Sequence, residues 1–229
     1  MRLLLIETAT QVCSVAIAED ETIVTSRESI EANAHSSHLA PFIEEMLKER
    51  NLKAGDIDVV GVSSGPGSYT GLRIGVSSAK GMCYALGIPI VSVPTLQGMA
   101  ELYYRLHPNY NGFVCPMIDA RRMECYTAIF SRNGLVRDTC ADIINEGIYD
   151  QWLDRGEVVF IGDGAEKTRA VLGIHPNARF DIAFRPAAEG LVSTALRKIK
   201  SGETEDVAYF EPFYLKDFVA KKSVVHGLR

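Results

Sequence analysis

A glycine-rich segment near residue 70 shows the clearest pattern of potential chemistry in this sequence. It follows the apolar run 57–62, which predicts a buried strand, and it leads into residues with helical spacing of apolar side chains. A glycine-rich turn between a strand and a helix exposes backbone N–H groups at the positive end of the helix, where anions bind well. The candidate residues of this loop are Gly65, Pro66, Gly67, Ser68, Tyr69, Thr70, Gly71 and Arg73.

The spacing of this segment excludes two common phosphate-binding sequences. No Gly-Lys-Ser/Thr follows four residues after a glycine, as in a Walker A loop, and Gly65, Gly67 and Gly71 have the wrong last interval for a dinucleotide fingerprint. A structural role is the alternative, because Gly71, Gly75 and Ala79 would leave one helix face nearly bare for another backbone to approach. The sequence leaves the ligand loop and the structural turn both open.

Two polar turns could contribute to the same chemistry. The segment 7–10 follows the first predicted strand, and the segment 119–124 follows the strand that opens the second half. In a nucleotide-binding β-hairpin, carboxylates and hydroxyls at such positions would face Mg²⁺ and phosphate. Ordinary polar turns, the second with its own salt bridge, are the alternative. The candidate residues of the two hairpins are Glu7, Thr8, Thr10, Asp119 and Arg121.

Other reactive side chains give weaker patterns. His35 and His38 lie three residues apart near a predicted helix start and could share a metal, but no further histidine is close in sequence. We therefore expect surface or interface histidines and no metal site. No Ser–His–Asp set or catalytic cysteine can be assigned.

Composition and charge indicate an ordinary folded protein. Of the 229 residues, 47% are apolar and 23% are charged, which excludes a mainly disordered chain. The net charge of -5 argues against wholesale binding to a nucleic-acid backbone. Five cysteines without a Cys-x-x-Cys pair indicate buried free thiols in a reducing compartment. No run is long enough for a signal peptide or a membrane span, so we expect a cytoplasmic protein.

The order of predicted elements occurs twice along the chain. Three strands in a meander are followed by alternating helices and strands, which predicts an α/β fold with mixed sheets. In the first half the strands are expected at 3–7, 13–18, 22–27, 57–62 and 88–93, and the helices at 35–49, 71–86 and 95–105. After a turn-rich break at 107–112, the strands are expected at 113–118, 124–130, 135–139 and 158–161, and the helices at 146–153, 165–171 and 187–200. The predicted halves are therefore 1–106 and 107–229, and the last helix could pack on either.

Several segments together resemble the bacterial TsaB (YeaZ) family over nearly the whole chain. The most specific match is 65–75 followed by Ala79-Lys80-Gly81, and one departure is Glu7, where the family usually has aspartate. The further matches are 4–10, 13–16, His35-Ser36, Leu39, Pro41, Thr95-Leu96, 119–122, Glu124, 162–164 and 212–215.

The resemblance implies an actin-like (ASKHA, ribonuclease H-like) fold of two related subdomains. It implies a non-catalytic scaffold that binds and stabilises TsaD for N6-threonylcarbamoylation of adenosine 37 in tRNA, with TsaE in the larger complex. It also implies indirect or weak tRNA contact, no tightly bound cofactor, and ATP or ADP only within the complex, and it leaves open whether the isolated chain is a homodimer or a monomer. An actin-like ATPase or a metallopeptidase is the alternative. Counting along the chain puts Thr95 and Met99 where the sibling TsaD has its metal-binding histidines, which counts against the peptidase.

The same resemblance implies a partner surface on helices of the first half. The apolar stripes of the helices from residues 35 and 71 exceed what one sheet face needs, and surplus apolar surface usually marks an interface. The alternative is that both helices pack wholly within their subdomain. The candidate interface residues are Leu39, Phe42, Ile43, Met46, Leu72, Val76 and Cys83.

Overall fold

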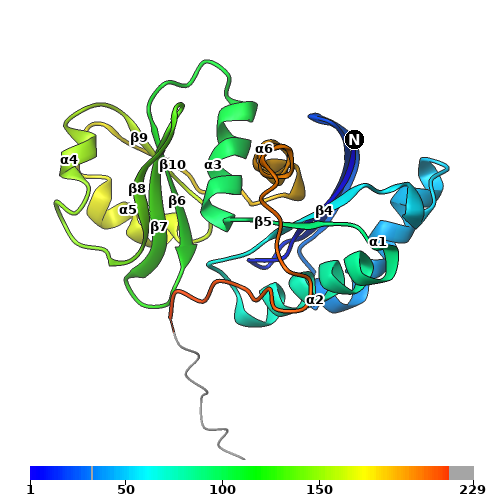
Figure 1. The fold of residues 1–229 in the computed structure, drawn as a ribbon. Coiled ribbons are helices and arrows are strands. Elements are labelled where there is room, and N and C mark those ends of the chain that lie inside the picture. Colours follow the sequence, from blue (N-terminus) through cyan, green and yellow to red (C-terminus); the bar gives the residue numbers. More distant parts are fainter. Residues whose placement is uncertain (32, 217–229) are drawn as a thin grey trace, which may run out of the picture.

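The predicted duplication of strands and helices is present in the computed structural model, which describes residues 1–31 and 33–216 (Figure 1). The first half contains β1 (Arg2–Glu7), β2 (Cys13–Glu19), β3 (Thr22–Ser29), α1 (Ala34–Glu49), the short helix η1 (Ala54–Asp56), β4 (Val59–Ser63), α2 (Tyr69–Leu86), β5 (Ile90–Val93) and α3 (Thr95–Leu106). The second contains β6 (Phe113–Asp119), β7 (Glu124–Ser131), β8 (Gly134–Ile143), α4 (Asp150–Leu153), β9 (Val158–Ile161), α5 (Ala165–Leu172), β10 (Ala178–Asp181), η2 (Ala188–Leu191) and α6 (Val192–Ser201).

The two sheets have the same strand order. The first runs β3-β2-β1-β4-β5 and the second runs β8-β7-β6-β9-β10 when read from the matching edge. In each, the first three strands are antiparallel neighbours, and the fourth and fifth run parallel to the first. This duplicated mixed sheet is the α/β, actin-like fold expected from the sequence.

The central strand β1 is apolar throughout because both faces of its sheet are covered. Leu4 and Ile6 pack with α1 and α2, whereas Leu3 and Leu5 pack with η2 and α6 on the other face. The last helix therefore returns to the first sheet. The division at residues 106 and 107 stays a prediction.

Helix α3 lies between the two sheets. Its apolar side packs on β6 and β7 of the second half, and its small residues meet η2 on the first. A Cβ on Gly190 would lie well under 3.0 Å from the backbone oxygen of Gly98, so the two segments meet backbone to backbone. The Glu101 carboxylate accepts hydrogen bonds from the backbone N–H of Thr194 (3.2 Å) and from its hydroxyl (2.6 Å), which ties α3 to α6.

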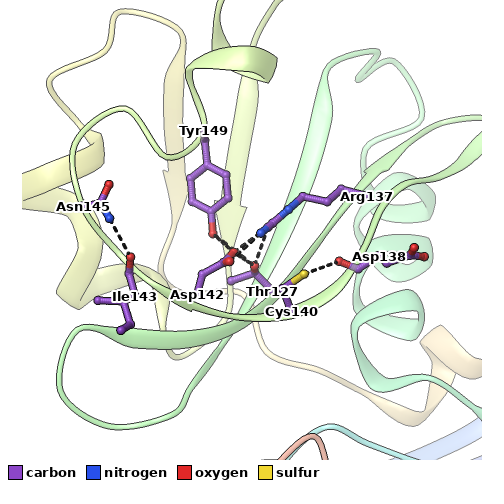
Figure 2. Close-up of polar contacts among 8 residues, drawn as sticks. All are labelled: Thr127, Arg137, Asp138, Cys140, Asp142, Ile143, Asn145 and Tyr149. Carbon is purple, nitrogen blue, oxygen red and sulfur yellow. Dashed lines mark hydrogen bonds and ion pairs between the residues drawn. The ribbon is translucent and has the colours of Figure 1, made fainter.

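A buried polar network stabilises the second half (Figure 2). The guanidinium of Arg137 donates two hydrogen bonds of 2.6 Å to the two carboxylate oxygens of Asp142. The hydroxyls of Thr127 (2.5 Å) and Tyr149 (2.8 Å) donate to the same carboxylate. Burial alone would raise the pKa of Asp142, but these hydrogen bonds outweigh it and lower the pKa.

The second half differs from the sequence prediction at four elements, the first of which is β8, predicted at 135–139 but formed by Gly134–Ile143. The helix expected at 146–153 is confined to α4, and the helix expected at 187–200 is divided into η2 and α6. The edge strand β10 was not predicted, because its residues Ala-Arg-Phe-Asp are half-exposed and mixed in polarity. Among the residues that the structure describes, no helix has the length and apolar character needed to cross a membrane.

Candidate functional site in the cleft between the halves

A cleft of about 590 Å³ separates the two halves, and the three segments singled out in the sequence meet there. Thr10 of the first hairpin, residues 66–70 of the glycine loop, and Asp119 and Arg121 of the second turn all line it. The other candidates lie behind the cleft wall or on the outer surface: Glu7, Thr8, Gly65, Gly71 and Arg73.

The glycine loop is stabilised by its own hydrogen bonds. The Ser68 hydroxyl accepts from the backbone N–H of Gly71 (3.2 Å) and so caps the start of α2, as serine commonly does. The backbone N–H of Ser68 donates to the carbonyl of Ala9 (2.6 Å). Two of the amides that an anion would need at this helix start are therefore already used.

The small residues of α2 allow the first hairpin to touch the helix. A Cβ on Gly71 would lie well under 3.0 Å from the backbone oxygen of Thr8, and one on Gly75 would be equally close to the Thr8 hydroxyl. A Cβ on Gly67 would collide with the backbone oxygen of Ala9. These contacts are the close backbone approach that the sequence predicted, and they support the structural role of the three glycines.

The first hairpin uses its amides internally. The backbone N–H of Thr8 donates to the Ser63 hydroxyl (3.3 Å), and that of Ala9 donates to Glu7 Oε1 (2.6 Å). The backbone N–H of Val12 donates to the Thr10 hydroxyl (3.3 Å). In this conformation the hairpin therefore presents few of the amides that would bind a polyphosphate, which argues against the phosphate role proposed from the sequence.

Glu7 points into the protein and is only 1% exposed. Its carboxylate accepts from Ala9 and from the Ser63 hydroxyl (3.0 Å). Burial raises the pKa of Glu7 from 4.5 to about 7, and the hydrogen bonds offset only part of that effect. The folded chain therefore holds a proton on Glu7 at a pH where the unfolded chain has released it.

We expect this proton to make the stability of the chain depend on pH. Between about pH 4.5 and about pH 7 the folded state binds more protons, so each pH unit lowers the free energy of unfolding by up to about 1.4 kcal/mol. Glu7→Gln keeps a neutral side chain of the same shape and should remove this decline. Urea unfolding across that range measures it. If the free energy of unfolding changed with pH in the same way in the wild type and the variant, the raised pKa of Glu7 would be contradicted.

In the second turn, Asp119 is already bound to other groups of the protein. The Asp119 carboxylate accepts from the backbone N–H of Arg121 (2.7 Å) and pairs with the ammonium of Lys167. The backbone N–H of Asp119 donates to Asp163 (2.9 Å), whose pKa is raised mainly by burial. The turn is therefore charged, but its ion pair is with Lys167 on α5 and not within the turn, as the sequence alternative had it.

The two histidines of α1 make separate contacts. His35 Nε2 lies 3.2 Å from the carbonyl oxygen of Val12, whereas the ring of His38 packs against Phe42 and its Nε2 lies 3.7 Å from Glu31. Within the described ranges, no three His, Cys, Asp or Glu residues gather as a metal site would require. The described residues thus do not bring these histidines together on one ion.

The interface residues predicted on α1 and α2 are corrected by their burial. Six of the seven belong to the chain's own core and cannot contact a partner: Leu39, Ile43, Met46, Leu72, Val76 and Cys83. Phe42 is half-buried and packs against the same core. The prediction was wrong because both helices lie on one face of the first sheet. Their apolar side chains pack against that sheet and against each other. The exposed sides carry Pro41 and Glu44 on α1, and Ser77, Gly81 and Tyr84 on α2.

The C-terminal tail is the part of the site that the sequence analysis missed. Phe213, Tyr214, Leu215 and Lys216 line the cleft beside the glycine loop. The backbone N–H of Phe213 donates to the carbonyl of Ser64 (2.7 Å), and its own carbonyl lies where a side chain on Gly65 would sit. The aromatic cluster at 209–214 was visible in the sequence, but nothing local indicated where it packs.

The duplicated sheets and the cleft between them define an actin-like protein. Component A of (R)-2-hydroxyglutaryl-CoA dehydratase from Acidaminococcus fermentans shares this fold, with a TM-score of 0.52 and 13% identity over 87% of this chain and 99% of that one. YeaZ from Pseudomonas aeruginosa is much more similar, with a TM-score of 0.78 and 26% identity over 93% of this chain and 99% of that one.

Sequence comparison narrows the class further. The family model TsaD, described as tRNA N6-adenosine threonylcarbamoyltransferase, matches residues 23–224. The tRNA threonylcarbamoyladenosine biosynthesis protein TsaB of Escherichia coli K12 is 32% identical, and the match covers 98% of both chains. The TsaB protein of Bacillus subtilis is 31% identical over 62% of this chain and 61% of its own length. The chain therefore belongs to the TsaD-type family and, within it, to the TsaB (YeaZ) proteins.

Proposed function

We propose that this chain is a non-catalytic subunit that binds and stabilises TsaD for N6-threonylcarbamoylation of adenosine 37 in tRNA. The observation that carries the proposal is the burial of Thr95 and Met99, the positions where counting along the chain puts the metal-binding histidines of the catalytic sibling. Both side chains are buried, Thr95 at 0% and Met99 at 1% exposure. The Thr95 hydroxyl accepts from the backbone N–H of Gly65 (3.1 Å), and Met99 packs in the core around α3. Both side chains thus help to stabilise the fold.

The exposed sides of α1 and α2 are the proposed TsaD-binding surface. Tyr84 is 85% exposed on α2, and the neighbouring turns carry the small residues Ser77 and Gly81. Small residues let a partner helix approach closely, and an exposed tyrosine is a common centre of binding energy. The same surface on a second copy would give the proposed homodimer of the isolated chain.

We expect Tyr84→Ala to weaken binding to TsaD by about 30-fold, which corresponds to ~2 kcal/mol. The side chain packs on nothing in its own core, so the free energy of unfolding should stay unchanged. Calorimetric titration with purified TsaD measures the affinity, and tRNA modification by the mixture measures the function. Lys200→Glu is the control, because α6 covers the opposite face of the first sheet. Wild-type affinity in Tyr84→Ala would place the interface elsewhere.

The remaining parts of the proposal concern nucleotides, TsaE and location. Several backbone amides of the two hairpins are already hydrogen-bonded within the protein. This supports the proposal that the chain holds no tightly bound cofactor and that ATP or ADP binds only within a complex that also includes TsaE. Contact with tRNA would be indirect or weak, and the complex would act in the cytoplasm. An ATPase assay of the chain alone and with TsaD tests this. Turnover by the isolated chain would favour the alternative, an actin-like ATPase.

A further inference from the structure

The tail after α6 runs back past β5, the edge strand of the first sheet, and along the mouth of the cleft. The backbone N–H of Glu205 donates to the carbonyl of Ile90 (2.9 Å) in an isolated antiparallel bridge. From there the chain passes α2 and reaches the lower ends of β6 and β7, as the orange-to-red ribbon in Figure 1 shows. Residues 205–216, called the clasp below, therefore extend from one half to the other.

The clasp is anchored on the first half by several contacts. The ammonium of Lys80 on α2 donates to the carbonyls of Ala208 (3.2 Å) and Phe210 (2.8 Å). Phe210 packs against the core under α1 and α2, and Phe213 is bonded to Ser64. Because both backbone hydrogen bonds and the packing of a core side chain hold this part of the clasp, it should stay bound to the first half.

The next residue is fixed against the start of α2. The Tyr214 hydroxyl accepts from Arg73 Nε (3.2 Å), and its ring lies 5.0 Å from the ring of Tyr69, measured between centroids. The Arg73 guanidinium also lies over the Tyr69 ring, 4.2 Å from its centroid. The clasp therefore leaves the first half at a defined point beside the glycine loop.

The tip reaches the second half through a much weaker contact. The ammonium of Lys216 pairs with the carboxylate of Glu124, the first residue of β7, and the two side chains are 47% and 20% exposed. Exposed ion pairs contribute little to stability and are screened by salt. The clasp thus joins a firm anchor to a tip that can be released.

The position of the tip gives its release a structural consequence. In Figure 1 the halves are joined by α3 above, and the clasp crosses between them below. The contact of α3 with the first half is the close approach of Gly98 to Gly190 of η2. A rotation about the α3 contact would change the width of the cleft mostly at the side where the clasp crosses. We propose that residues 205–216 act as a releasable clasp: the Lys216–Glu124 pair holds the two halves together and sets the width of the cleft.

The test measures the distance between the halves by spin labelling. Labels are attached to Glu44→Cys on α1 and Asn133→Cys in the β7–β8 turn, both exposed, in a chain that also carries Cys140→Ser. The other four cysteines are buried and should not react. Lys216→Gln removes the pair, Lys216→Arg keeps it, and Arg179→Gln breaks a control pair with Glu157 that lies wholly within the second half.

We expect Lys216→Gln to increase the population of longer distances by about two- to fivefold, the range that an exposed ion pair can supply. High salt should do the same to the wild type, whereas Lys216→Arg and Arg179→Gln should leave the distribution unchanged. Glu124→Gln should match Lys216→Gln, and the double variant should open no further than either single one. Unchanged distances in Lys216→Gln at low salt, or additive effects in the double variant, would overturn the proposal.

Discussion

Gly71→Ala is expected to lower the free energy of unfolding of the isolated chain by about 2–3 kcal/mol. The new Cβ would meet the backbone oxygen of Thr8, which belongs to the hairpin and cannot move without pulling β1 and β2. A clash with backbone atoms destabilises the protein more than a clash with a side chain, because no change of rotamer can relieve it. Denaturant unfolding followed by circular dichroism measures the change.

The same substitution at Gly81 is the matched control. Gly81 lies on the same helix, and a Cβ there would meet nothing within 4 Å. Alanine is the better helix former, so Gly81→Ala should stabilise the isolated chain by up to ~1 kcal/mol. If both variants shift the unfolding midpoint in the same direction, the glycines of α2 are not distinguished by their packing.

Arg137→Met is expected to cost about 3–5 kcal/mol, because it leaves the buried Asp142 carboxylate without its cation. The side chain of Asp142 is 9% exposed, and that of Arg137 is 20% exposed, so water can replace little of the lost interaction. Arg179→Met breaks an ion pair whose side chains are 53% and 40% exposed, and it should cost only about 0–1 kcal/mol. Thermal or urea unfolding of the two variants gives the comparison.

The cost of Arg137→Met should shrink in acid. In the wild type the pKa of Asp142 is lowered below its ordinary value of 3.8, so its contribution is present above that pH and is lost as the pH falls through the folded value. In the variant the unpaired carboxylate should protonate more readily, which relieves the penalty at low pH. A difference between wild type and variant that stays constant from neutral pH to about pH 3 would contradict this account.

The sequence was sufficient for the overall architecture because most of the elements, although not β10, have a local signature. The apolar runs of β1 and β4, the helical spacing of α1, and the recurrence of three strands before the helices all follow from side-chain periodicity. The bare face of α2 also predicted a close approach of another backbone, and Thr8 supplies it.

The details of the site depend on contacts between distant residues, which periodicity does not reveal. The spacing of apolar residues around Met46 on α1 and Val76 on α2 identifies an apolar face on each helix, but not what packs against that face. In the structure, the chain's own sheet packs there. Glu7 turns inward because Ser63, 56 residues away, offers it a hydroxyl. The clasp is positioned by Lys80 and Ser64, neither of which is near it in sequence.

The return of α6 to the first sheet has a consequence for how the chain is made. Leu3, Leu5 and Ala16 lie on a sheet face that is covered by Leu191, Val192 and Ala195, which are synthesised after the whole second sheet. The second sheet is contiguous, from Phe113 to Asp181, so all its strands have been translated before that cover exists. Domains usually fold in the order in which they leave the ribosome. Here one apolar face of the half that is made first stays open to water until the whole second sheet and then η2 and α6 have been translated.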